Sequence, residues 1–257
     1  MTLRVADARD ELLAARRERR TLTRFTDDHP DLDADWGLAV QAQLRRSHEE
    51  AGDPVVGAKL GLTSEAKQRT MGVHEPIVGF LTAGMDLARV ADPSAAVAEL
   101  VQPRVEPEVA FVLGRDLAGP VDVAELPSYV ASVATALEVL DARWTGYRFG
   151  LADVLADNTS AAAYVVGEPV PLPDDLASHE ARWLVDDELV TTTSPAAILG
   201  DPLLALAHLS EHVGRRRMVL PAGAVVLAGA MTDAVPLEQG SRFTVEVDGL
   251  PALTLAR

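Results

Sequence analysis

The chain has 257 residues, of which 39 are acidic and 23 basic, and its formal net charge is −16. This charge argues against nucleic acid and anionic membranes as partners, because both repel an acidic surface. The absence of cysteine excludes disulfides, thiolate metal sites and cysteine nucleophiles. No apolar run reaches the roughly 18 residues that span a bilayer, and the N-terminus lacks the apolar core of a signal peptide. We therefore expect a cytoplasmic protein.

The N-terminal part of the chain is predicted to be helical. Trp36, Val40 and Leu44 recur at i, i+4 and i+8, which is the spacing of one apolar helix face. Asp33 or Asp35 can cap the start of this helix, because a short acidic side chain accepts a hydrogen bond from the first turn.

Further along the chain, short apolar runs are broken by glycine and proline, a pattern typical of β structure. Strands are predicted at 55–62, 103–114, 137–144, 161–167, 181–193, 224–229 and 242–255, and helices at 64–72, 126–136 and 200–214. The expected fold class is α+β. Residues 1–54 form a helical segment packed on a mostly antiparallel or mixed β body of residues 55–257.

Two glutamates, Glu106 and Glu108, lie one residue apart inside an apolar run. Side chains at i and i+2 of a strand point to the same face, and two adjacent carboxylates repel unless something cationic lies between them. A hard divalent cation, Mg²⁺ or Mn²⁺, prefers such oxygen ligands. Glu138, an acid in another apolar run, is a candidate third ligand. The alternative is a solvated edge strand marked by Pro107.

Lys59 is a lone lysine in an apolar segment. Since lysine is rarely buried without a partner, it either forms an ion pair with a nearby acid or binds a substrate carboxylate and moves a proton. His208 and His212 match the H-x-x-E-H pattern of inverted zincins, but the surrounding segment has the apolar stripe of an ordinary amphipathic helix, which we favour. No nucleotide-binding glycine motif indicates nicotinamide or ATP chemistry.

Five blocks of sequence occur in an order that resembles the fumarylacetoacetate hydrolase superfamily. The similarity covers roughly residues 5–255, and the blocks are 57–85, 101–117, 136–144, 151–167 and 221–237. The closest branch is that of 2-hydroxypenta-2,4-dienoate hydratase and 2-oxo-3-hexenedioate (4-oxalocrotonate) decarboxylase. The resemblance implies a mixed β-roll or barrel-like body with an N-terminal helical layer. It also implies a divalent metal, usually Mg²⁺, on Glu106, Glu108 and Glu138, with Lys59 at the position of the family's lysine.

The resemblance favours decarboxylation of 2-oxohex-3-enedioate to 2-hydroxypenta-2,4-dienoate and CO₂. The hydratases carry an acid in a QPDFG-like stretch, and Ile77 stands at that position here. Hydration must activate water and benefits from an added acid–base group, whereas decarboxylation needs mainly an electron sink and a dry pocket. Three alternatives stay open: the dienoate hydratase, an acylpyruvate-type C–C hydrolase, and a non-catalytic partner subunit.

A small anionic 2-oxo acid is the expected ligand. We expect a homo-oligomer, and association with a hydratase or decarboxylase partner is a further expectation. The turn at residues 227–237 departs from the family pattern at Met231 and Asp233, which points to an unusual substrate. Candidate substrate-binding residues are Thr63, Ser64, Ile77, Asp157, Ser160, Gly229 and Thr232.

Overall fold

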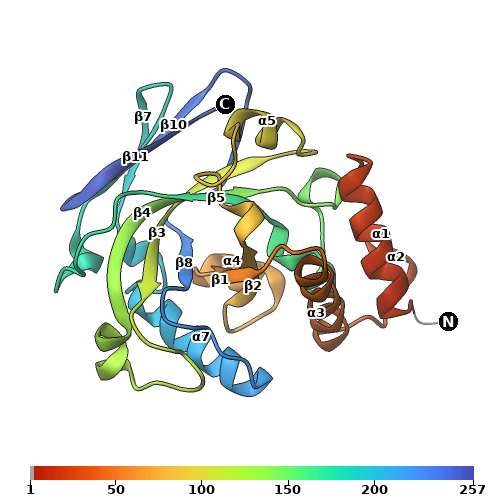
Figure 1. Ribbon diagram of the computed structural model, residues 1–257. Helices are drawn as coiled ribbons and strands as arrows, with labels where there is room; N and C mark the ends of the chain where they lie inside the picture. Colours follow the sequence, from red (N-terminus) through yellow and green to blue (C-terminus); the bar gives the residue numbers. More distant parts are fainter. Residues whose placement is uncertain (1–2) are drawn as a thin grey trace.

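The N-terminal helices lie on one flank of the molecule, as the computed structural model in Figure 1 shows. The model describes residues 3–257, apart from the side chains of Glu65 and Thr70. The Asp33 carboxylate accepts a hydrogen bond from Trp36 N at 2.9 Å, and Val40 and Leu44 are buried, which confirms the predicted cap and apolar face. The helices are α1 (Val5–Arg17), α2 (Phe25–Asp28) and α3 (Ala34–Glu50).

A strongly curved seven-stranded sheet forms the body, in the order β2-β1-β8-β3-β4-β5 with β9 paired to β3. The β1–β8 pair is parallel and the other pairs are antiparallel, which confirms the predicted mixed body. Because β3 lies between β8 and β4, the edge-strand alternative for Glu106 and Glu108 is wrong. The strands are β1 (Val55–Gly61), β2 (Ile77–Thr82), β3 (Arg104–Leu113), β4 (Val130–Leu140), β5 (Ala161–Val166), β8 (Val225–Ala230) and β9 (Val235–Pro236).

A second sheet, in the order β11-β10-β6-β7, packs against β4 on the other flank (Figure 1). The run 181–193 was predicted as one strand but is a hairpin. Asp186 and Asp187 turn the chain with φ of 53° and 65°, the pair of positive values that a two-residue hairpin turn requires. The run 242–255 is likewise a hairpin. The strands are β6 (Ala181–Val185), β7 (Glu188–Thr193), β10 (Arg242–Val247) and β11 (Leu250–Ala256).

The predicted helix at 126–136 is also wrong. A 3₁₀ segment, Val123–Tyr129, leads directly into β4. The alanine content favours a helix locally, but residues from Val130 onward pair with β3, and residues 133–136 are buried in this strand. Tertiary packing commonly outweighs such weak propensities.

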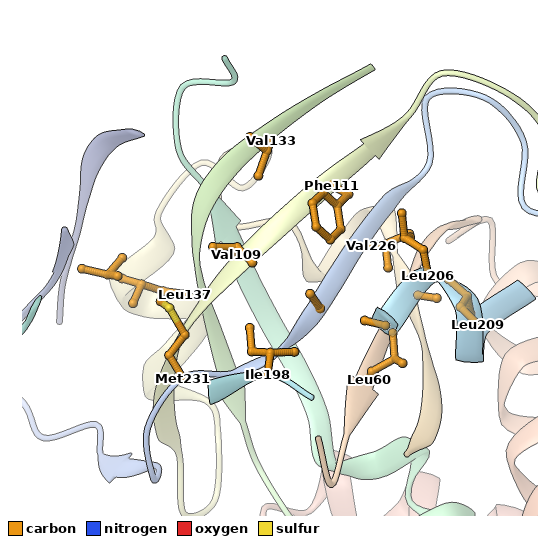
Figure 2. Packing of buried hydrophobic residues seen from close by; sticks show 14 of the residues in the cluster. Leu60, Val109, Phe111, Val133, Leu137, Ile198, Leu206, Leu209, Val226 and Met231 are labelled. Atoms are coloured by element: carbon orange, nitrogen blue, oxygen red, sulfur yellow. The ribbon is translucent and has the colours of Figure 1, made fainter. Parts of the chain in front are cut away.

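The main hydrophobic core lies between the large sheet, the second sheet and α7 (Leu203–Arg216) (Figure 2). Leu206 and Leu209 of α7 join Phe111 and Val226 in it. Met231 is 4% exposed and belongs to the same cluster. Its departure from the family pattern therefore supplies core volume.

Three short helices complete the fold: α4 (Glu65–Met71), α5 (Pro93–Ala98) and α6 (Leu151–Ala156). Ser64 Oγ accepts a hydrogen bond from Lys67 N at 3.3 Å, and Gly72 ends α4 with φ of 66°, so α4 is capped at both ends of the predicted helix. None of the helices within the described residues has the length and apolar character for a membrane crossing. The division of the chain after residue 54 stays a prediction.

Candidate metal centre and substrate cavity

Three glutamates meet on one face of the β3–β4 pair. Glu106 and Glu108 point to the same face of β3 because they are two residues apart, and Glu138 stands directly opposite Glu106 on β4. One carboxylate oxygen from each lies within 4.8 Å of the others, and all three residues are buried. Among the side chains that the structure describes, no other group of three acidic or histidine ligands comes this close.

Several of these carboxylate oxygens have nothing to bind. Gly229 N donates to Glu108 Oε2 at 2.8 Å, but Glu108 Oε1 and Glu138 Oε1 are buried without a hydrogen-bond partner among the described residues. Burial raises the pKa of Glu138 to about 7. Burial and the neighbouring Glu138 raise the pKa of Glu108 well above its usual value. Unpaired buried charge is costly, and a hard divalent cation with oxygen ligands would remove that cost. The donor set therefore fits such a cation.

Lys59 stands beside the cluster on β1. Its Nζ lies 2.9 Å from Glu138 Oε2 and donates to Thr159 O at 3.4 Å. Burial disfavours the ammonium ion, but the charges of Glu138, Glu108 and Glu106 outweigh burial and raise the pKa of Lys59. The predicted ion pair with a nearby acid is confirmed, and Lys59 is cationic at neutral pH.

A cavity of about 430 Å³ opens next to the carboxylates and Lys59. Its walls combine cationic and apolar side chains, and among the described side chains the carboxylates that line it are those of Glu106 and Asp233. The lining residues are Lys59, Gly61, Leu62, Lys67, Ile77, Arg104, Glu106, Leu140, Tyr147, Phe149, Val154, Thr159, Ser160, Asp233 and Ala234. The cavity can therefore take a small anion with a hydrocarbon chain.

Ile77 and Ser160 are the predicted substrate-binding residues that line this cavity. Ser160 is the last residue of a tight turn. Asn158, Thr159 and Ser160 have φ of 48°, 54° and 62°, a backbone region that costs non-glycine residues energy. The Asn158 side chain stabilises the turn through hydrogen bonds with Phe80 N and O, each 2.9 Å. The hydroxyl oxygens of Thr159 and Ser160 are buried without a partner in the described part of the chain. Both hydroxyl groups therefore keep unused hydrogen-bonding capacity in residues that line the cavity.

The structure places Asp157 elsewhere. Its carboxylate accepts hydrogen bonds from Arg143 N and Nε, each at 2.8 Å, and Asp157 is absent from the cavity lining. Arg143 also donates a hydrogen bond to Asp141 Oδ2 at 3.3 Å. This buried triad stabilises the segment that follows β4.

The remaining predicted residues surround the cavity without lining it. Thr63 packs against the backbone of Gly229, Gly229 donates to Glu108, and Ser64 is used as the cap of α4. Thr232 Oγ donates to Asp233 O at 3.1 Å and borders a neighbouring depression beside β7. Their common effect is to position Glu108, α4 and Asp233.

Sequence reasoning did not assign Lys67, Arg104, Tyr147, Phe149 or Asp233 to the site. Lys67 Nζ lies 3.4 Å from Glu106 Oε1 and 3.7 Å from Asp233 Oδ1. The strand period that paired the glutamates also places Arg104 on their face, so this residue could have been found.

Residues 47–255 match the model of the fumarylacetoacetate (FAA) hydrolase C-terminal family, and the chain belongs to this family. It is 33% identical over 235 residues to 4-oxalocrotonate decarboxylase of Pseudomonas putida, covering 90% of this chain and 88% of the relative. It is 36% identical over 249 residues to 2-keto-4-pentenoate hydratase of Burkholderia vietnamiensis, and this match covers 96% of this chain and 94% of the relative.

A solved structure supports the same assignment. The chain resembles 4-oxalocrotonate decarboxylase from Pseudomonas putida G7, complexed with magnesium and adipate, with a TM-score of 0.90 and 29% sequence identity. The match covers 99% of this chain and 98% of that protein. The curved sheet, the second sheet and the helices therefore form the fold of this family.

Proposed function

We propose that the protein is a Mg²⁺-dependent carbon–carbon lyase that decarboxylates 2-oxohex-3-enedioate to 2-hydroxypenta-2,4-dienoate and CO₂. The observation that carries this proposal is the cavity wall beside the three glutamates. Ile77 stands where water activation would call for an acid, and Leu62, Phe149 and Val154 extend the apolar surface. Such a wall suits loss of a carboxylate as CO₂ in a dry pocket.

Glu106, Glu108 and Glu138 would hold the metal, Mg²⁺ or Mn²⁺, which when bound supplies a Lewis acid for the 2-oxo acid end of the substrate. Lys59 balances the negative charge that moves onto the 2-oxo oxygen when the distal C5–C6 bond breaks. It is also placed to donate the proton that converts the resulting enolate into the enol product. Thr159 and Ser160 offer hydroxyl groups for the 1-carboxylate.

Hydration of 2-hydroxypenta-2,4-dienoate is the second candidate. Relatives named as hydratases are as similar to this chain as those named as decarboxylases. Asp233, whose side chain is 96% exposed at the cavity, is the acid that water activation would use.

An acylpyruvate hydrolase is less well supported. Such a hydrolase needs a water-activating dyad, for which His48 and Glu49 of the N-terminal segment are the candidates. His48 pairs with Asp53 at 2.9 Å, Glu49 pairs with Arg45 at 3.0 Å, and neither lines the cavity. A non-catalytic role is disfavoured because Lys59 and all three glutamates are present and come together.

Three expectations stay predictions: self-association, a hydratase or decarboxylase partner, and a cytoplasmic location.

The test is to incubate the protein and Mg²⁺ separately with 2-oxohex-3-enedioate and 2-hydroxypenta-2,4-dienoate, following ultraviolet absorbance and CO₂ release. We expect CO₂ from the first compound and none from Glu108→Gln protein purified in the same way. Consumption of the second compound without CO₂, with the first left unchanged, would establish the hydratase instead.

A further inference from the structure

Three cations line the cavity, and they differ in what they contact. Lys59 pairs with Glu138, and Lys67 lies beside Glu106 and Asp233. Arg104 forms no ion pair with any carboxylate whose position the structure describes. In a chain of net charge −16, a half-buried arginine without a carboxylate partner is free to bind an anionic ligand.

Tyr147 determines where the Arg104 guanidinium lies. Arg104 Cζ stands 4.3 Å from the centre of the Tyr147 ring, within the range of a cation–π contact. The Tyr147 hydroxyl lies 3.1 Å from both Gln102 O and Leu140 O and donates to them. Burial raises the pKa of the Tyr147 phenol above its usual value, so the phenol stays neutral. Stacking uses the face of the guanidinium and leaves its in-plane N–H donors available for a carboxylate.

Arg104 also lies at a suitable distance from the metal ligands. Arg104 stands opposite Leu140, and the next pair on the same face of β3 and β4 is Glu106 opposite Glu138. Two residues of a strand span about 7 Å. The two carboxyl carbons of an extended six-carbon diacid are roughly 6 Å apart, given C–C bonds of about 1.5 Å. Leu140, beside Arg104 on the neighbouring strand, contributes an apolar surface to the cavity.

We propose that Arg104, positioned by Tyr147, binds the distal carboxylate of the substrate and makes the site selective for 2-oxo dicarboxylates. This inference rests on the proposed function, because the distal carboxylate is the group that leaves as CO₂. The ion pair forms in the ground state and weakens as negative charge moves along the carbon chain. Loss of Arg104 should therefore raise KM much more than it lowers kcat. CO₂ carries no charge, so the product loses this contact and can leave.

Binding of two matched ligands tests the inference without relying on turnover. 2-Oxohexanedioate and 2-oxohexanoate share a 2-oxo acid end and a six-carbon chain, and only the first has a distal carboxylate. Calorimetry in the presence of Mg²⁺ should show that the wild type prefers the diacid at least tenfold, as a charge-assisted contact implies. Arg104→Gln should reduce this ratio to about twofold or less and leave the affinity for 2-oxohexanoate unchanged. Arg104→Lys, which keeps the positive charge, should retain part of the preference for the diacid.

Arg115→Gln is the matched control. Arg115 stacks on Tyr129 at 5.4 Å, just beyond the other end of β3, and does not line the cavity. This variant should keep the wild-type preference.

The proposal is overturned if the wild type shows no preference for the diacid. It is also overturned if the Arg104→Gln protein keeps that preference, or if this substitution weakens the binding of both ligands equally. The decarboxylation assay is scored separately. A decarboxylase whose selectivity is unchanged by Arg104→Gln would refute this inference alone. Arg104-dependent diacid binding without CO₂ release would refute the proposed function alone.

Discussion

Glu108 connects the chemistry of the site to the stability of the fold. The residue is 0% exposed, and one of its carboxylate oxygens has no hydrogen-bond partner in the described part of the chain. The resulting rise in its pKa reflects a real cost of keeping the carboxylate ionised without a cation. The neutral, nearly isosteric glutamine removes the charge and keeps an oxygen that can accept the Gly229 N–H.

We therefore expect Glu108→Gln to weaken Mg²⁺ binding at least 100-fold, because a ligand and a negative charge are lost. The free energy of unfolding without metal should be unchanged or higher. Titration calorimetry and urea unfolding in a chelator measure the two effects. Glu188→Gln, at an exposed position on β7, should change neither. Undiminished Mg²⁺ affinity in Glu108→Gln would show that the three glutamates are not the metal site.

At the scale of elements, the turns that follow β1 and end β8 are fitted to each other. Gly229 has φ of 121°, and a Cβ there would lie 2.3 Å from Thr63 Oγ and 2.5 Å from Thr63 Cγ2. This close approach lets Gly229 N reach Glu108 while Thr63 leads the chain into α4. A glycine is required at residue 229 by both its conformation and its neighbour.

Gly229→Ala should destabilise the protein by about 2–5 kcal/mol, the sum of backbone strain and overpacking. Thr63→Ala in the Gly229→Ala background should restore part of this loss, because it removes the two nearest atoms. Gly223→Ala is the control: its φ is 86° and no atom lies within 4 Å of the added Cβ, so only the strain remains. Urea unfolding of the variants measures the effects, and strictly additive costs for residues 63 and 229 would contradict the proposed contact.

The features that sequence reasoning predicted well depend on local rules. Glu106 and Glu108 share a face because a strand has a period of two, and buried Lys59 had to find an acid. Residues 126–136 were misassigned because the pairing of β4 with β3 and β5 is non-local. Tyr147 could not be placed beside Arg104 for a related reason. It belongs to an irregular segment, and Gly146 and Tyr147 take φ of 65° and 60° with no periodic pattern to indicate it.

At the scale of the whole molecule, a second cavity of about 430 Å³ lies between α3, α7 and the start of β2. Ile77 borders both cavities and therefore contributes to the wall between them. Charged and titratable side chains surround the second cavity: Asp35, Glu75, His208, His212, Arg215 and Arg216. Among these residues, the pKa of His212 is lowered by its surroundings.

His212 should make the folded state lose stability in mild acid. Burial, followed by the charges of Arg216 and Arg215, lowers the pKa of His212 to about 4. An unfolded histidine takes up a proton near pH 6.5. Between these values the unfolded chain binds more protons, so the stabilisation present above pH 6.5 is lost as the pH falls towards 4. We expect the free energy of unfolding to fall by on the order of 2 kcal/mol more in the wild type than in His212→Gln between pH 7.5 and 4.5.

Urea unfolding at a series of pH values measures this difference, with chelator present so that metal binding does not contribute. His74→Gln, which removes an exposed imidazole, is the control and should follow the wild type. If the free energy of unfolding depends on pH in the same way in His212→Gln and the wild type, then His212 takes up a proton in the folded state as freely as in the unfolded chain. The helical layer would then not be coupled to pH through this residue, and the acid sensitivity of the fold would have to come from its carboxylates.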